Sequence, residues 1–239
     1  MEVHQTTVSM PCVLLLAFLT LCGIAYLYWR YVWFFRNPSR KIPSEDSGIL
    51  SPADGCVVYV KEVAPGEEII TIKQGVKATI HDICREAVSA PKVLIGIFMS
   101  PFNVHYNRVP LSGTALFIRH YPALGKNLYM AAMHMRTLFR RLPLYRNSLH
   151  IIQNERTVTG IKGHYRGNLL NCYVVQIAAA SVNGIDSYIE PQQQVSVGQV
   201  LGMIRIGSQV DLIVTAFDGM KIKVQPGDRV RAGETVLIE

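Results

Sequence analysis

The feature that most constrains this sequence is a long, uncharged apolar segment near its amino terminus. Between Glu2 and Arg30 there is no Asp, Glu, Lys or Arg, and the residues from Pro11 to Trp29 are mostly large and apolar. As a helix, that stretch would extend about 28 Å, close to the hydrocarbon thickness of a bilayer, about 30 Å. Aromatic side chains gather at its end, as at a membrane–water interface: Tyr26, Tyr28, Trp29, Tyr31 and Trp33. We therefore predict a transmembrane helix within a membrane anchor of residues 1–36.

Basic residues follow this segment, and none precedes it. Arg30, Arg36, Arg40 and Lys41 come after the apolar stretch, so the positive-inside rule predicts a cell-membrane protein whose catalytic domain lies on the cytoplasmic side. A cleaved signal peptide is one alternative, but the segment lacks a basic amino-terminal region, and bulky aromatics follow its small-residue candidate at 23–25. A helical hairpin that dips into one leaflet is the other, and it stays open.

The remainder, residues 37–239, has the pattern of one mainly β (α+β) domain. Pro38 and Pro43 mark a linker, and short runs rich in Val, Ile and Tyr follow, separated by Gly and Pro turns. The predicted strands are residues 55–60, 68–72, 93–99, 149–153, 172–178, 200–206, 211–216 and 230–238. Helices are predicted over residues 77–86 and 128–141. Glycine turns between short valine-rich strands indicate a barrel-sandwich-like domain with few helices.

Composition limits the classes of partner. Hydrophobic residues make up 49% and charged residues 17%, which excludes a disordered chain or a coiled coil. The net charge of +7 favours anionic partners such as phospholipid. Nucleic acid is not expected, because the basic residues are not interleaved with stacking aromatics. Five scattered cysteines without a CxxC pair, and histidines without ligand spacing, predict neither a disulfide framework nor a metal site.

The pair Gly207–Ser208 lies between two apolar runs, in LGMIRIGSQVDLIV. On its own, the pair would indicate a tight turn in a hairpin. Its context resembles the phosphatidylserine decarboxylase family, particularly the short form, over nearly all of residues 33–239. The resemblance rests on an ordered set of segments: WFFRNPSRKIP, SPADG, FMSPFNVHYNRVPLSGT, NER, VVQIAAASV, IRIGSQVDL and VQPGDRVRAGETVL. Members of that family are pyruvoyl-dependent enzymes.

The resemblance implies a proenzyme that cuts itself. The Ser208 hydroxyl attacks the carbonyl of Gly207, and an ester forms by an N→O acyl shift. Loss of the Ser208 α-proton then releases a β chain, residues 1–207, from an α chain, residues 208–239, whose first residue becomes a pyruvoyl group. That ketone forms a Schiff base with the substrate amine and accepts electrons as carbon dioxide leaves. The implied substrate is an anionic serine phospholipid, diacyl or ether-linked, and the product is the ethanolamine lipid.

The resemblance also implies roles for three further residues. His105 in NVHYNRVP is the expected acid/base group, since histidine titrates near neutral pH. Full-length members carry a second histidine three residues later, where this chain has Arg108, so it stays open which histidine role His105 fills. Arg108 is the candidate substrate-binding residue, because its fork suits a phosphate or carboxylate. Asp54 in SPADG matches the family aspartate that assists the histidine during self-cleavage. The local sequence alone favours an aspartate in a β-turn before Gly55. Asp211 receives no role.

The segment 128–146 is basic and amphipathic, and two interpretations of it stay open. Its arginines could lie at lipid phosphates with its apolar residues in the membrane interface, or it could be an ordinary surface helix. Two other functions are also kept as alternatives. One is a biotinyl or lipoyl carrier, for which Lys221 would be the attachment site. The other is a family member that never cleaves and acts as a membrane scaffold. The cleavage products would form a heterodimer, and a homo-oligomer is left open.

Overall fold

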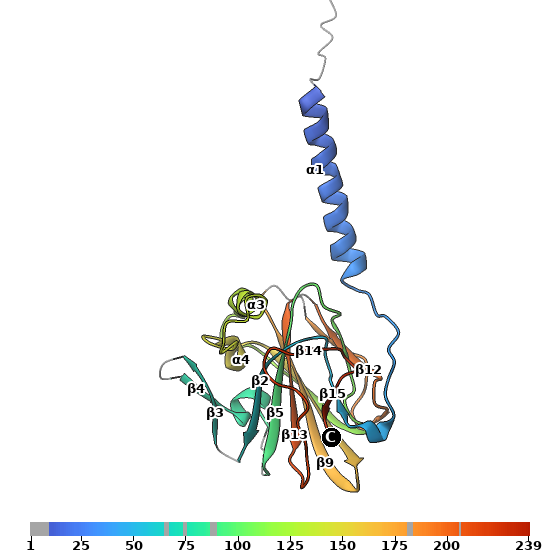
Figure 1. Ribbon diagram of the computed structural model, residues 1–239, viewed down its shortest axis with the longest axis vertical. Helices are drawn as coiled ribbons and strands as arrows, with labels where there is room; N and C mark the ends of the chain where they lie inside the picture. The colour runs from blue at the N-terminus through green and yellow to red at the C-terminus, as the bar shows by residue number, and fades with distance from the viewer. Residues whose placement is uncertain (1–9, 65–66, 74–75, 87–89, 181–183, 206) are drawn as a thin grey trace, which may run out of the picture. The chain divides into compact units, whose positions relative to one another are not determined.

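The computed structural model describes all residues except 1–9, 65–66, 74–75, 87–89, 181–183 and 206, and it describes residues 68–73 by their backbone only. The chain divides into two compact units, Met1–Arg36 and Asn37–Glu239. The first contains α1 (Met10–Tyr28), which continues as a π-helical turn, η1 (Trp29–Trp33) (Figure 1). The span Met10–Trp33 is long and apolar enough to cross a membrane, and none of its most apolar window is buried. The predicted apolar helix is confirmed.

The second unit is built around one eight-stranded antiparallel sheet that curls into half a barrel (Figure 1). In spatial order its strands are β11 (Gln194–Val195), β7 (Gly113–Tyr121), β8 (Arg156–Tyr165), β9 (Asn168–Ala178), β13 (Ser208–Thr215), β5 (Lys92–Met99), β2 (Gly55–Val63) and β14 (Arg229–Val230). The central strand β13 pairs with both β9 and β5. In that register its first residue, Ser208, lies opposite Ala178 on one side and Met99 on the other.

Smaller sheets and short helices complete this unit. The sheets are β10–β12–β6 (Ile185–Ser187, Val200–Ile204 and Tyr106–Arg108), β1–β15 (Ile49–Leu50 and Val236–Ile238) and β3–β4 (Glu68–Lys73 and Val76–Thr79). The helices are η2 (Glu45–Ser47), α2 (Ile80–Cys84), α3 (Ala131–Leu138) and α4 (His150–Gln153). The mainly β fold with few helices is therefore confirmed.

Both faces of the central sheet are buried, because β13 alternates between two apolar clusters. Val210 and Leu212 belong to the first cluster. Ile213 belongs to the second, on the opposite face. Side chains alternate along a strand, so Gln209 and Asp211 lie on the same face as Ile213. Both are polar, and both are completely inaccessible to water.

Two predicted strands were wrong. Residues 149–153 form the helix α4 instead, since a short apolar run does not distinguish a buried strand from a buried helical turn. The predicted strand 230–238 is two strands, β14 and β15. They are separated by a turn in which Gly233 has φ of +72°, a left-handed conformation that glycine adopts easily. Position 206, the end of a third predicted strand, lies outside the described residues.

Other elements differ at their ends or were not predicted. The predicted helix 77–86 is shorter, because Val76–Thr79 is strand β4 and the helix begins only after Thr79. Thr79 and Asp82 cap it by reciprocal hydrogen bonds, a capping box. The predicted helix 128–141 is α3, which covers Ala131–Leu138. Strands β7 and β8 were missed because each mixes charged and polar residues with apolar ones, which weakens the strand pattern.

Arg156 gives a first prediction, about stability. It is completely buried, and its guanidinium donates hydrogen bonds to the carbonyls of Ile83, Ile151 and Asn154 at 2.7, 2.9 and 2.8 Å. Arg156→Met leaves these buried acceptors unpaired, so we expect the free energy of unfolding to fall by about 3 kcal/mol or more. Denaturant unfolding of the detergent-solubilised chain measures it. The exposed-site control Arg166→Met should change it by less than about 0.5 kcal/mol, and an equal effect of both would contradict the prediction.

Candidate active site

Ser208 begins β13, and its side chain is completely buried. Its Oγ donates a hydrogen bond to Sδ of Met99 on the neighbouring strand at 3.3 Å. Asn107 also donates to that sulfur, at 3.6 Å, and accepts a 2.8 Å bond from Nε2 of Gln176. A thioether is a weak acceptor, so the hydroxyl loses little when it turns toward another group. Ser208 is thus held loosely among buried polar side chains.

The peptide bond before Ser208 is shaped by Gly207. Its φ is +59°, in the left-handed region that glycine adopts without steric cost. The Gly207 carbonyl oxygen accepts a hydrogen bond from the backbone N–H of Ala179 at 3.2 Å. A fixed N–H aimed at a carbonyl stabilises the negative charge that develops on the oxygen when a nucleophile attacks its carbon. The bond between residues 207 and 208 therefore has both a neighbouring hydroxyl and a donor on its carbonyl.

Asn154 holds the peptide unit that supplies this donor. Its Nδ2 donates to the carbonyl of Ala178 at 2.7 Å, and that carbonyl shares a peptide plane with the Ala179 N–H. The same amide group exchanges hydrogen bonds with the backbone of Leu128 at 2.8 and 2.9 Å. A donor on the carbonyl of a peptide also polarises its N–H, since linked hydrogen bonds strengthen one another. Asn154 is completely buried, so this arrangement is fixed.

His105 lies in the connection between β5 and β6 and is completely buried. Its Nδ1 is 3.0 Å from the carbonyl oxygen of Asn103. Because a carbonyl only accepts, Nδ1 carries a hydrogen, and Nε2 has a lone pair whenever the ring is neutral. The His105 carbonyl accepts from the N–H of Ile204, on the strand that leads to Ser208. The fold therefore brings a nitrogen capable of acting as a base to the end of the sheet where Ser208 lies.

Known sequences share these segments. The sequence model described as phosphatidylserine decarboxylase matches residues 27–238. The chain belongs to the phosphatidylserine decarboxylase family. A relative named phosphatidylserine decarboxylase proenzyme from Chlorobium chlorochromatii is 33% identical over 91% of this chain and 82% of its own length. Proenzymes of the same name from Carboxydothermus hydrogenoformans and Cytophaga hutchinsonii are each 34% identical, over 88% and 86% of this chain and 80% and 75% of their own lengths.

In this decarboxylase-family chain, Asp54 contacts the linker that follows the anchor. One carboxylate oxygen accepts from the backbone N–H of Ala232 at 2.8 Å, and the carboxylate pairs with Arg40 at 3.0 Å. Asp54 directly precedes β2, which is two strands away from Ser208 in the order β13–β5–β2. Two strand spacings amount to about 10 Å. Its expected assistance to His105 therefore stays a prediction, and its contacts in the uncleaved chain are structural.

Arg108 lies in the same linker contact. Its guanidinium donates to the carbonyl of Gly198 at 2.8 Å and to Oδ1 of Asn37 at 2.6 Å. Burial lowers the pKa of this guanidinium, and the nearby positive charge of Arg40 lowers it further. These contacts fasten the first residues of the second unit to the rest of that unit. A substrate-binding role for Arg108 stays a prediction, and it would require the group to leave these partners.

A polar network that the sequence did not reveal lies on the other face of β13. Tyr59 donates to Asp211 at 2.7 Å, and Gln209 donates to both of them at 2.7 Å. Nε2 of His150 lies 3.2 Å from Oε1 of Gln209. Burial raises the pKa of Asp211 to about 6, although the hydrogen bonds from Tyr59 and Gln209 act in the opposite direction. Burial lowers the pKa of His150 to about 4. Polar residues at alternate positions of an apolar strand were the signal available in the sequence.

This network gives a second prediction, about pH. Between pH 3.8 and about 6, folded Asp211 binds protons that the unfolded chain has released, so its stabilising contribution is lost as pH rises through about 6. His150 has the opposite effect, because its pKa is lower in the folded chain than in the unfolded one. Its contribution to stability therefore increases as pH rises from about 4 to 6.5. Each shift corresponds to about 3 kcal/mol, so the two nearly cancel. In Asp211→Asn, only the rising contribution of His150 remains.

We therefore expect the stability of Asp211→Asn, relative to the parent chain, to increase by about 3 kcal/mol from pH 4 to pH 7. Denaturant unfolding of both proteins at several pH values measures this difference. The control is Asp218→Asn, which changes an exposed acid, and its stability relative to the parent should change by less than about 1 kcal/mol over the same range. A difference between Asp211→Asn and the parent that does not change with pH would contradict the role given to Asp211.

Proposed function

We propose that this chain is a membrane-anchored proenzyme that cleaves itself between Gly207 and Ser208 and then decarboxylates a serine phospholipid to the ethanolamine lipid. The observation that carries the proposal is the geometry of that peptide bond. Gly207 is in a left-handed conformation, its carbonyl accepts from Ala179, and the Ser208 hydroxyl is bonded only weakly, to a thioether. Membership of the decarboxylase family and the proenzyme names of the relatives support the same function.

Cleavage needs no atom from outside except one water molecule. The Ser208 Oγ forms a bond to the Gly207 carbonyl carbon, the C–N bond breaks, and the hydroxyl proton passes to the released amine. A base then takes the α-proton of Ser208, and the Cβ–Oγ bond breaks, which frees the Gly207 carboxylate. The dehydroalanine left at 208 tautomerises to an imine, and water converts it to the ketone with loss of ammonia. The β chain 1–207 and α chain 208–239 stay paired through β13, which lies between strands of the β chain.

His105 is the residue that we assign to proton transfer in these steps. Its burial and the bond from Nδ1 to Asn103 fix the ring, and Nε2 is the basic nitrogen. The Ala179 N–H stabilises the oxyanion formed on the Gly207 carbonyl. When present, the pyruvoyl group made from Ser208 supplies an electron sink for decarboxylation. The side chains around it, Met99, Asn107 and Gln176, are buried, so the group would lie in a site shielded from bulk solvent.

Asn154 gives a third prediction, about positioning. Asn154→Ala removes the bond to the Ala178 carbonyl, so the Ala179 N–H is less well aimed and less polarised. We expect self-cleavage to slow by about tenfold, less than the 10²–10³-fold loss typical when an oxyanion donor is deleted outright. The time course of cleavage after synthesis measures it. Asn168→Ala, at the half-buried first residue of β9, should cleave at the parent rate.

The control for folding is a second variant. Asn154→Gln keeps an amide that can donate, and it should restore part of the cleavage rate if the amide acts on the peptide unit. If Asn154→Ala and Asn154→Gln cleave at the parent rate, Asn154 does not position the oxyanion donor. Unfolding measured in parallel separates slow cleavage from loss of structure.

The apolar helix is proposed to hold the enzyme in the membrane where its substrate resides. The basic residues after the helix favour a catalytic unit on the cytoplasmic side of the cell membrane. Protease treatment of right-side-out and inverted vesicles tests this orientation, since the second unit should be digested only in inverted vesicles. Digestion in right-side-out vesicles would reverse the assignment.

The function is tested with the full-length protein in vesicles containing phosphatidylserine labelled at the serine carboxyl group. The proposal predicts labelled carbon dioxide, phosphatidylethanolamine in equal amount, and inhibition by borohydride in the presence of substrate. A carrier would stay intact and gain mass on Lys221, and a scaffold would show neither change. A chain that is cleaved but releases no carbon dioxide would refute the proposed substrate, and an intact, inactive chain would refute the proposal as a whole.

A further inference from the structure

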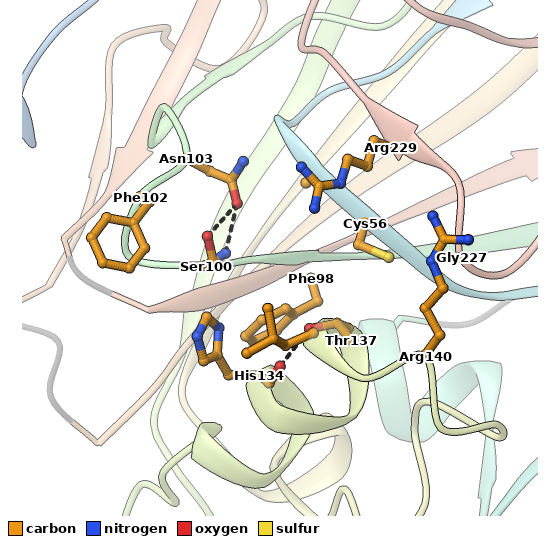
Figure 2. Close-up of a pocket in the computed structure, with 12 residues that line it drawn as sticks. Cys56, Phe98, Ser100, Phe102, Asn103, His134, Thr137, Arg140, Gly227 and Arg229 are labelled. Atoms are coloured by element: carbon orange, nitrogen blue, oxygen red, sulfur yellow. Dashed lines mark hydrogen bonds between the residues drawn. The ribbon is translucent and has the colours of Figure 1, made fainter.

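A cavity of about 490 Å³ adjoins the end of the sheet at which Ser208 lies (Figure 2). Phe98 and Ser100, which line it, flank Met99, the residue paired with Ser208 and bonded to its hydroxyl. Ser100 and Asn103 form a tight turn at its edge, with bonds of 2.9 and 2.7 Å to the Asn103 side chain. The Asn103 carbonyl is also the partner of His105. The cavity is thus connected directly to the proposed catalytic residues.

The cavity carries positive charge. Its described lining residues are Gly55, Cys56, Phe98, Ser100, Phe102, Asn103, His134, Thr137, Leu138, Arg140, Gly227 and Arg229, and none of these is acidic. Figure 2 shows Arg140 and Arg229 near Cys56, and the positive charge of both opposes the rise that burial causes in the pKa of that thiol. Asp228, which lies between the lining residues Gly227 and Arg229, accepts a bond from the N–H of Gln225. The site therefore suits a singly charged phosphate diester.

The backbone places Arg140 at the cavity at some cost. Helix α3 ends with a Schellman turn, in which the N–H of Arg141 bonds to the carbonyl of Arg136 at 3.0 Å. Arg140 occupies the left-handed position of that turn, with φ of +50°, where glycine is preferred. A side chain in this conformation costs about 1 kcal/mol. An arginine in place of glycine fits a site that uses the guanidinium.

Large apolar side chains border the same cavity and are exposed to water. Phe102 is 64% exposed and Leu138 is 60% exposed, and both line the cavity. Phe139 and Leu142, which follow α3 in the chain, are also exposed, by 58% and 69%. Arginines beside exposed aromatic and aliphatic side chains suit the headgroup level of an anionic membrane.

We propose that this cavity binds the phosphodiester of a phospholipid still embedded in the membrane, with Arg140 and Arg229 at the phosphate and Phe102 and Leu138 in the interface. The inference rests on the proposed function, and it names the site through which the substrate headgroup is held. It also assigns the basic, amphipathic segment 128–146 to the lipid surface. The occupant is a bilayer lipid, since a free phosphate would use the arginines but not the apolar edge.

The first test uses the full-length protein and the double variant Arg140→Gln/Arg229→Gln, with Arg166→Gln, at an exposed turn, as the matched control. All should cleave themselves at the parent rate, since neither arginine contacts residues 207 and 208 in the described structure. We expect the apparent KM for phosphatidylserine, measured against its mole fraction in vesicles, to rise at least about tenfold in the double variant. Arg166→Gln should change it less than about twofold.

The second test separates a lipid surface from a free anion. Phe102→Ser/Leu138→Ser should lower activity on vesicles by about tenfold but leave activity on a soluble short-chain phosphatidylserine unchanged, because that substrate needs no membrane contact. Inorganic phosphate should compete weakly. Loss of activity on both substrates, or phosphate competing as well as the lipid, would overturn the interfacial site.

The outcomes also separate this inference from the proposed function. If the parent protein does not cleave or release carbon dioxide, the proposed function fails and the inference fails with it. If the parent is active and the double arginine variant is processed with an unchanged KM, the phosphate site alone is refuted. A raised KM with normal processing supports it.

Discussion

Ser208→Ala should yield a single uncleaved chain that releases no carbon dioxide. The substitution removes the only atom that we assign as the nucleophile for the Gly207 carbonyl, and with it the source of the ketone. Ser208 is completely buried beside Met99, and its one hydrogen bond is to a thioether, so the alanine variant loses little stability. Denaturing electrophoresis and mass spectrometry measure cleavage, and labelled phosphatidylserine measures decarboxylation.

The matched control is Ser187→Ala, which changes an exposed serine on β10. It should be cleaved and active like the parent. Ser208→Cys keeps a nucleophile and should cleave slowly through a thioester. Cleavage of Ser208→Ala at the same bond would mean that another group cuts the chain, and the central chemistry proposed here would be wrong.

His105→Ala should slow self-cleavage by about 10²–10⁴-fold, the usual contribution of a general acid/base. The ring is buried and fixed through Nδ1, so the substitution removes a base that is held in one position. The fraction of cleaved chain over time after synthesis measures the effect. His164→Ala, an exposed histidine on β8, is the control and should be cleaved normally.

Chemical rescue distinguishes a proton-transfer role from a structural one. Imidazole added to His105→Ala should restore part of the cleavage rate, because it can enter the space left by the ring, and the restored rate should increase with pH as imidazole loses its proton. His105→Gln keeps much of the volume without a basic nitrogen and should remain slow. Normal cleavage of His105→Gln would assign the proton transfer to another residue.

The parts of the fold that were predictable follow from strong, local patterns. The uncharged run at 11–29 specifies a helix by itself, and the β-branched runs at 55–60 and 93–99 specify strands that the structure confirms. The five-residue run at 149–153 also contains isoleucines, but residues 150–153 form a helix, since so short a run leaves the choice to tertiary packing. Strand β8 contains arginine, threonine and histidine, and its neighbours β7 and β9 determine its conformation.

The candidate site could be predicted only where its residues are neighbours in the sequence. Gly207 and Ser208 are neighbours in sequence, so their role followed from the resemblance. The contacts of Ala179 with Gly207 and of Asn154 with Ala178 join segments that are distant in sequence, so no sequence spacing reveals them. The linker contacts of Asp54 and Arg108 depend in the same way on where Arg40 and Asn37 fold back.

The charged cavity illustrates the same limit. Arg140 and Arg229 are far apart in sequence and come together only because β14 pairs with β2 while α3 ends nearby. The sequence offered the basic segment 128–146 with two interpretations, a lipid surface or a solvated helix. The apolar residues that border the cavity favour the first, and the vesicle experiments test it.

The most direct test of the account is the intact mass of the carboxyl-terminal fragment from the purified parent protein. We predict a fragment of residues 208–239 that is blocked to Edman degradation, lighter by one ammonia than the serine-started peptide, and heavier by two hydrogens after borohydride reduction. An active preparation in which the amide between Gly207 and Ser208 is unbroken, or in which the fragment begins with an unmodified serine, would contradict it.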